Sequence, residues 1–142
     1  GGVGMASAVD YCFATKYASV KLSELAIGIG PFVVGPAVER KMGVSAMSTL
    51  AINATKWFDA KWAMGKGLFA EVFESTEEMD NHIKILSEKL GKSHYKANKA
   101  LKTILWQGTE KWDELLVERA KISGELILSN FSKKIIESIL NK

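Results

Sequence analysis

The sequence holds few of the residues that mark several specialised classes of protein. Its only cysteine, Cys12, cannot form an internal disulfide, so we expect a reducing compartment and place the protein in the cytoplasm. No apolar run approaches the roughly 20 residues of a membrane span, and the start lacks the basic segment and apolar core of a signal peptide. These absences predict a soluble protein with no membrane partner.

The sequence also lacks a large excess of charge of either sign. The formal net charge is +3 and the basic residues are dispersed, which argues against a nucleic-acid partner. The two histidines, His82 and His94, have no cysteine or carboxylate at ligand spacing, so we predict no metal site. What remains is an ordinary globular composition, with 47% apolar and 25% charged residues over 142 positions. A chain of this length suffices for one domain with a hydrophobic core.

The first residues are the most informative stretch. Residues 1–4 read Gly-Gly-Val-Gly and open into a run of small and apolar residues, which predicts a helix that reaches Asp10. Glycines at a helix start let backbone N–H groups approach a ligand, and the positive end of the helix dipole favours negative charge there. Two short apolar segments, 11–14 and 18–22, are predicted as strands. By themselves such features more often reflect tight packing than a ligand site.

A glutamate, a glycine and a proline follow these strands. Glu24 comes directly after the second strand, and Gly28 and Pro31 come next. This order and spacing resembles the enoyl-CoA hydratase/isomerase, or crotonase, superfamily. The alanines at 60 and 63, followed by the Gly-Leu pair at 67–68, resemble a helix and strand start of that family. The resemblance is close over 1–75 and loose beyond it.

The resemblance implies an α/β fold in two parts. Residues 1–75 would be the C-terminal part of the ββα spiral core, and 76–142 a helical C-terminal region, so this chain would be mostly helical. Family members are nearly twice as long and carry several strands before the glycine motif. We therefore expect a C-terminal fragment, separated from its N-terminal half by truncation or proteolysis, unless that half is a separate chain.

The local patterns predict the elements of both parts. Expected in chain order are helices over 32–42 and 45–53, a short helix after Asp59, a strand over 68–73, and helices over 76–90, over 93–106, after Thr109 and around 135–140. Gly43 should stop the first helix, and Ser75 with Glu78 has the spacing of a capping box. The apolar stripe of the last helices is wider than one domain needs. By resemblance it indicates contacts between subunits of a homo-trimer or hexamer, and a monomer core is the alternative.

The resemblance also implies the chemistry. Enzymes of this family stabilise the enolate of an acyl-CoA thioester, and the N–H of Gly1 would be one of two donors to its oxygen. Glu24 would carry the proton to and from the carbon beside the thioester. The positions expected to touch substrate are Gly2, Gly4, Leu25, Pro31 and Phe32. Coenzyme A belongs to the acyl-CoA substrate, so no separate cofactor is expected.

Two departures from the family pattern bear on the reaction. Hydratases of this family carry a second glutamate where this chain has Gly4, and the hydrolases and dienoyl isomerases carry an aspartate where it has Phe32. A single carboxylate resembles the Δ3-Δ2 enoyl-CoA isomerases. The Gly-Gly-Val-Gly motif looks like that of the thioester hydrolases of the same superfamily. An acyl-CoA thioester hydrolase therefore stays an alternative function. A second alternative is a catalytically inert fragment or assembly module, because the other oxyanion donor belongs to the N-terminal half.

Overall fold

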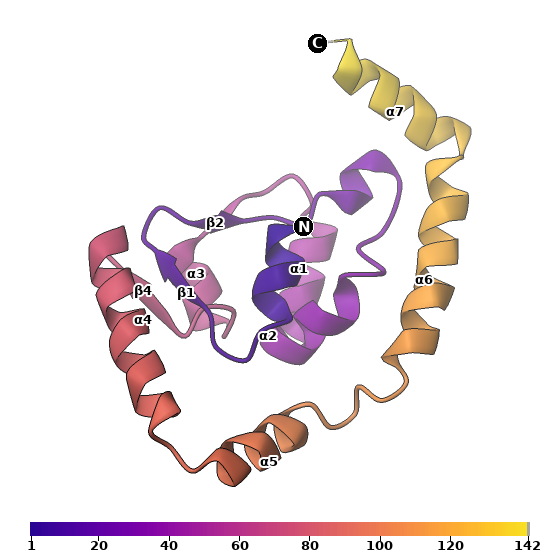
Figure 1. Cartoon of the computed structure of the whole chain (residues 1–142). Helices are drawn as coiled ribbons and strands as arrows, with labels where there is room; N and C mark the ends of the chain where they lie inside the picture. The colour runs from indigo at the N-terminus through magenta and orange to yellow at the C-terminus, as the bar shows by residue number, and fades with distance from the viewer. Residues whose placement is uncertain (142) are drawn as a thin grey trace.

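The computed structural model describes residues 1–141, so Lys142, the end of the predicted helical region, lies outside the described part (Figure 1). The elements in chain order are α1 (Gly2–Ser7), β1 (Phe13–Thr15), β2 (Ser19–Val20), η1 (Glu24–Ile27), α2 (Gly35–Ile52), β3 (Phe58–Asp59), α3 (Ala60–Gly65), β4 (Glu71–Phe73), α4 (Thr76–Gly91), α5 (Tyr95–Leu105), α6 (Trp112–Ile127) and α7 (Asn130–Leu140). The predicted combination of small sheets and mostly helical structure is confirmed.

Two short sheets lie in the first half of the chain. β1 pairs in parallel with β4, with Ala14 opposite Val72, and β2 pairs antiparallel with β3, with Val20 opposite Phe58. Their inward side chains join buried residues of α2 and α3 in one hydrophobic core, made of Ala14, Val20, Leu22, Val38, Met42, Ala46, Leu50, Phe58, Ala60, Ala63, Leu68 and Phe69. The core therefore lies wholly within the first 75 residues.

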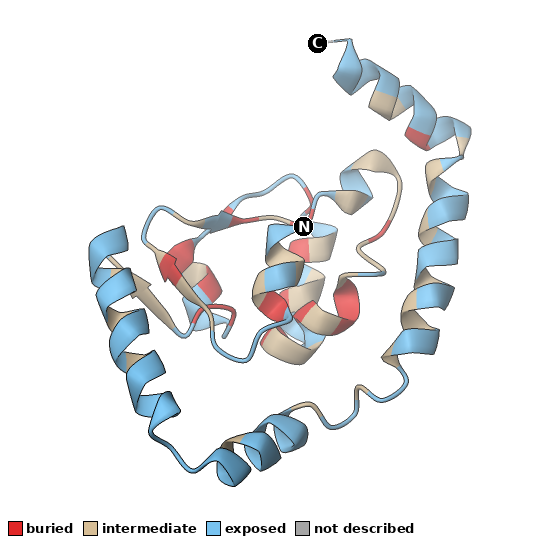
Figure 2. Cartoon of the chain, in the orientation of Figure 1, coloured by how far each residue is buried: buried red, intermediate tan, exposed pale blue. Residues whose placement is uncertain are grey.

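Helices α4 to α7 extend around this body as a curved arm (Figures 1 and 2). No residue of α4, α5 or α6 is buried, and Ser132 is the buried residue of α7. Large apolar side chains such as Ile104 and Leu140 are 59% and 78% exposed. The apolar stripe is therefore exposed among residues 1–141, and whether it belongs to a subunit interface or to the core of one protein stays a prediction. None of the described helices has the length and apolar character that a membrane crossing requires.

Several local predictions are confirmed because each rests on contacts within one turn of chain. The Asp59 carboxylate accepts a hydrogen bond from the Trp62 backbone N–H at 2.7 Å, which caps α3. Gly43 leaves helical geometry, with φ 78° and ψ 161°, and a second helical segment follows at once. The predicted stop at Gly43 is thus confirmed, and α2 consists of two helical segments that meet at a kink there.

Three local predictions are wrong in part. α1 ends at Ser7 rather than at Asp10, which is drawn into contacts with α5. Thr109 does not cap α6, because its hydroxyl donates back to the Trp106 carbonyl at 2.8 Å. The capping box is incomplete: the Ser75 hydroxyl accepts from the backbone N–H of Glu78, as predicted, but the Glu78 carboxylate accepts from the N–H of residue 74 instead of that of Ser75.

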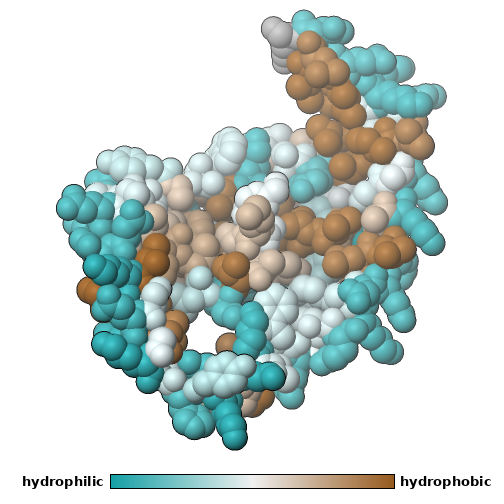
Figure 3. Space-filling view, in the orientation of Figure 1, coloured by the Kyte–Doolittle hydropathy of each residue, from teal (hydrophilic) through white to brown (hydrophobic). Residues whose placement is uncertain are grey.

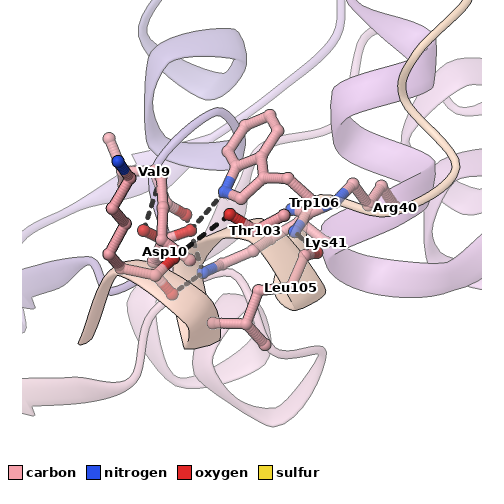
Figure 4. Close-up of polar contacts among 9 residues, drawn as sticks. Val9, Asp10, Arg40, Lys41, Thr103, Leu105 and Trp106 are labelled. Carbon is pink, nitrogen blue, oxygen red and sulfur yellow. Dashed lines mark hydrogen bonds and ion pairs between the residues drawn. The ribbon is translucent and has the colours of Figure 1, made fainter. Parts of the chain in front are cut away.

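Asp10 fastens α5 to the body (Figure 4). Its carboxylate accepts from Lys102 Nζ at 2.6 Å and from the indole Nε1 of Trp106 at 2.5 Å. The guanidinium of Arg40 lies 4.2 Å from the centre of the Trp106 ring and donates to the Leu105 carbonyl. Partial burial opposes ionisation of Asp10, but the hydrogen bonds from Lys102 and Trp106 outweigh it and hold its pKa below the ordinary value.

Candidate active site

Glu24 lies in a cavity of about 520 Å³ between the start of α1, the loop after η1 and helix α6. The lining residues are Gly1, Val3, Gly4, Met5, Lys21, Leu22, Ser23, Glu24, Ile29, Gly30, Pro31, Phe32, Val33, Val34, Ala37 and Ser123. Glu24 opens the short 3-10 turn η1, and its carbonyl accepts from the Ile29 N–H at 3.1 Å. Gly28 closes that turn at φ 82°, a conformation that suits glycine.

The carboxylate of Glu24 carries an unused hydrogen-bonding atom. Its Oε2 is buried and has no hydrogen-bond partner among residues 1–141. A buried polar atom without a partner costs about 1–3 kcal/mol. The fold tolerates this cost at the one carboxylate that lines the cavity. The free oxygen is therefore available to a group that enters the cavity, such as a carbon that loses or gains a proton.

The start of α1 lies at the same cavity. Gly1 and Gly4 line it, and the Gly1 carbonyl accepts from the Met5 N–H at 3.1 Å, which closes the first helical turn. The N–H groups of a first turn have no partners within the helix. The cavity thus places backbone donors and the positive end of a short helix near the carboxylate of Glu24.

Apolar side chains form much of the cavity wall. The Phe32 ring packs on Gly30 so closely that a Cβ at residue 30 would collide with it. A Cβ at Gly4 would lie 2.7 Å from Cγ2 of Val34, closer than carbon atoms pack. Position 4 therefore has no room for a side chain unless Val34 moves. The structure offers a packing reason for a glycine where a second carboxylate would otherwise stand.

The structure brings most of the predicted site residues together. Gly1, Gly4, Glu24, Pro31 and Phe32 all line the cavity. Gly2 lines a neighbouring cavity instead, and Leu25 lies outside both with 51% of its surface exposed. Whether each residue has its predicted catalytic or binding role stays a prediction.

Sequence reasoning missed two polar residues of this cavity. Lys21 lies at the end of the strand segment, with its Nζ 4.5 Å from the centre of the Trp57 ring. Ser123 comes from α6, in a region to which the sequence assigned only assembly. The sequence signal for Ser123 is the Ser-Gly pair at 123–124, where two small residues in succession interrupt the apolar face of that helix. No group of three metal-ligating side chains gathers anywhere within residues 1–141.

This combination of a glycine-led helix start, paired short strands and a carboxylate after the second strand agrees with the resemblance to the crotonase superfamily. The family model described as enoyl-CoA hydratase/isomerase matches residues 1–139, and the chain belongs to that family. No curated protein matches the chain.

Solved structures agree with this assignment. The chain is similar to an enoyl-CoA hydratase from Mycobacterium avium, with a TM-score of 0.85, 25% identity, and 99% of this chain and 55% of that one covered. An enoyl-CoA hydratase/isomerase from Pseudoalteromonas atlantica T6c has a TM-score of 0.85 at 19% identity, covering 99% and 56%. An enoyl-CoA hydratase from Bacillus halodurans has a TM-score of 0.84 at 23% identity, with 96% of this chain and 55% of that one covered. The latter two support the fold alone. The chain spans about half the length of these structures.

Proposed function

We propose that this chain carries the proton-transfer part of a crotonase-type active site that acts on an acyl-CoA thioester through its enolate. One observation carries the proposal. Glu24 presents a buried carboxylate oxygen without a partner, in the same cavity as the first backbone donors of α1. A base and an oxyanion-binding helix end are the two parts that enolate chemistry requires.

The mechanism assigns one step to each part. Glu24 removes a proton from C2 of a 3-enoyl thioester, the carbon between the carbonyl and the double bond, and the electron pair moves onto the thioester oxygen to give a dienolate that is reprotonated at C4. The N–H of Gly1 donates a hydrogen bond to that oxygen as its negative charge develops. Glu24 then returns the proton to a different carbon, so the double bond shifts and no atom is gained or lost. One carboxylate suffices for the whole cycle.

Isomerisation is favoured over hydration for the same reason. Hydration needs a second base to hold and deprotonate water, and Glu24 is the single carboxylate among the lining residues. Val34 closes the space at Gly4, and Phe32 places an aromatic ring where a second acid would stand by resemblance. The thioester hydrolase alternative lacks that second acid as well. We therefore favour a Δ3-Δ2 enoyl-CoA isomerase.

The rest of the site is proposed to come from other polypeptide. The second oxyanion donor and most of the coenzyme A surface belong, by resemblance, to the N-terminal half of the fold. The exposed apolar faces of α6 and α7 form patches in Figure 3. We propose that they pack on that half or on other subunits of a trimer or hexamer. Intact mass measured beside the size in solution tests this part, because a lone monomer of 15.6 kDa would contradict it.

The test of the proposed function uses recombinant protein, prepared together with any chain that co-purifies with it from its source. Conversion of a 3-enoyl-CoA to the 2-enoyl isomer is followed by NMR in D₂O, where proton transfer also places deuterium on the product. Glu24→Gln should lower turnover by about 10³-fold, within the range for loss of a general base, while thioester affinity changes little.

The matched control is Glu88→Gln, because Glu88 lies exposed on α4, away from the cavity. This variant should retain the wild-type rate. Unchanged turnover in Glu24→Gln would remove that residue from the mechanism. Absence of turnover with every thioester in the wild-type protein would favour the inert assembly module.

A further inference from the structure

A second cavity of about 350 Å³ lies between α2 and α6, next to the cavity of Glu24. Both arginines of the sequence, Arg40 and Arg119, line it. Arg40 comes from α2 and Arg119 from α6, and Trp112 and Leu115 supply apolar wall. The two arginines are thus 79 positions apart in the sequence and line the same cavity.

Arg119 is partly buried and has no acidic partner in the described structure. The ion pairs among residues 1–141 involve Lys16, His82 and Lys102, and none includes an arginine. Glu39 lines the same cavity but is exposed and pairs with neither guanidinium. Two guanidinium groups against one carboxylate leave the cavity with an excess of positive charge. This excess of positive charge makes the cavity suited to an anion.

The two cavities adjoin at Gly35. This buried residue lies between Val34, which lines the cavity of Glu24, and the next residue, which lines the second cavity. A Cβ at Gly35 would lie 3.7 Å from Nη1 of Arg119. On α6, Ser123 lines the first cavity and Arg119 the second. They are four residues apart on one helix face, a separation of about 6 Å.

The apolar residues Phe32, Val34 and Ala37 line the first cavity together with Ser123 of α6. Such a wall suits the hydrocarbon chain of an acyl group better than the amides of a pantetheine arm. An acyl chain that extends along this wall from a carbon at Glu24 would place its far end near the guanidinium of Arg119.

We infer that the second cavity binds a carboxylate at the far end of the acyl chain, so that the substrate is a thioester of a dicarboxylic acid. Arg119 forms the bidentate pair that a guanidinium makes with a carboxylate. Arg40, held by Trp106 and the Leu105 carbonyl, adds positive charge behind it. This inference rests on the proposed function, which puts the thioester at Glu24. A phosphate of coenzyme A has related chemistry, and the test separates the two.

The experiment compares adipoyl-CoA with hexanoyl-CoA, which has the same chain length without the carboxylate, and with free coenzyme A. The protein is prepared as for the activity assay, with ¹⁵N at arginine Nε, and binding is also measured by calorimetry. The Nε–H signal that disappears in Arg119→Gln identifies Arg119. Adipoyl-CoA should shift this signal and bind at least about tenfold more tightly than hexanoyl-CoA.

Arg119→Gln should abolish this preference and leave hexanoyl-CoA affinity unchanged. Lys121→Gln, an exposed charge on the same helix, should keep the preference. An equal shift with free coenzyme A would assign the cavity to a phosphate and overturn the inference. Binding of both thioesters with equal affinity would overturn it while leaving the proposed function intact. If neither thioester binds, the proposed function and this inference fall together.

Discussion

Gly4→Ala tests whether Val34 closes the space beside Glu24. The new Cβ would lie 2.7 Å from Cγ2 of Val34, and nothing else but Val34 lies within 4 Å of it. Overpacking of this kind costs about 1–3 kcal/mol, and a β-branched valine has few rotamers with which to relieve it. Alanine in place of a helical glycine gains up to about 1 kcal/mol. We therefore expect Gly4→Ala to be destabilising by up to about 2 kcal/mol.

The assay is a double-mutant cycle with Val34→Ala, measured by urea and thermal unfolding. Without the valine methyl groups, the same Gly4→Ala change should become stabilising, which gives a coupling energy of about 1–3 kcal/mol. For a chain of this size the coupling corresponds to about 3–9 °C in Tm. Gly2→Ala is the matched control in α1, because nothing lies within 4 Å of its Cβ position. Equal effects of Gly4→Ala in both backgrounds would refute the reasoning.

Further changes test how the arm is attached. Gly28→Ala should destabilise the protein by at least about 1 kcal/mol, because φ is 82° there and the Cβ would lie 2.6 Å from the Phe131 ring; faster hydrogen exchange in α7 would accompany the loss. Asp10→Asn should loosen α5, seen as a shifted indole N–H signal of Trp106, since the ion pair with Lys102 is lost. The folded-state pKa of Asp10 is lowered, so its stabilising effect is full above about pH 4 and disappears as the pH falls through that lowered pKa. The Trp106 signal of the wild type should therefore move toward that of Asp10→Asn in acid, and a pH-independent signal would contradict this.

The structural features that could be predicted are those decided by neighbouring residues. The cap at Asp59 and the break at Gly43 each depend on a few consecutive positions, and both occur in the structure. The end of α1 could not be predicted, because distant contacts compete with the local pattern. Asp10 binds side chains 92 and 96 residues further along the chain. No local pattern indicates such a partner.

The candidate site divides in the same way. Gly1 and Glu24 were found because a family resemblance fixes their spacing, and both line one cavity. Ser123 and Arg119 were not found, because they approach α2 only through the fold of the arm. Leu25 was placed in the site by its adjacency to Glu24. Successive residues of a 3-10 turn point in different directions, however, and this leucine faces outward.

Glycines and the large side chains packed against them determine the shape and polarity of this cavity. Gly4 and Gly30 leave space that Val34 and Phe32 fill, so hydrocarbon forms much of the cavity wall, together with the polar residues Lys21, Ser23 and Ser123. Under the proposed function, the hydrocarbon part of the wall would favour transfer of one proton within a bound chain. In the adjoining cavity, Arg119 lies beside Gly35 and has no acidic partner among residues 1–141. Glu24 would thus decide which bond moves, and Arg119 would decide which acyl chain is bound.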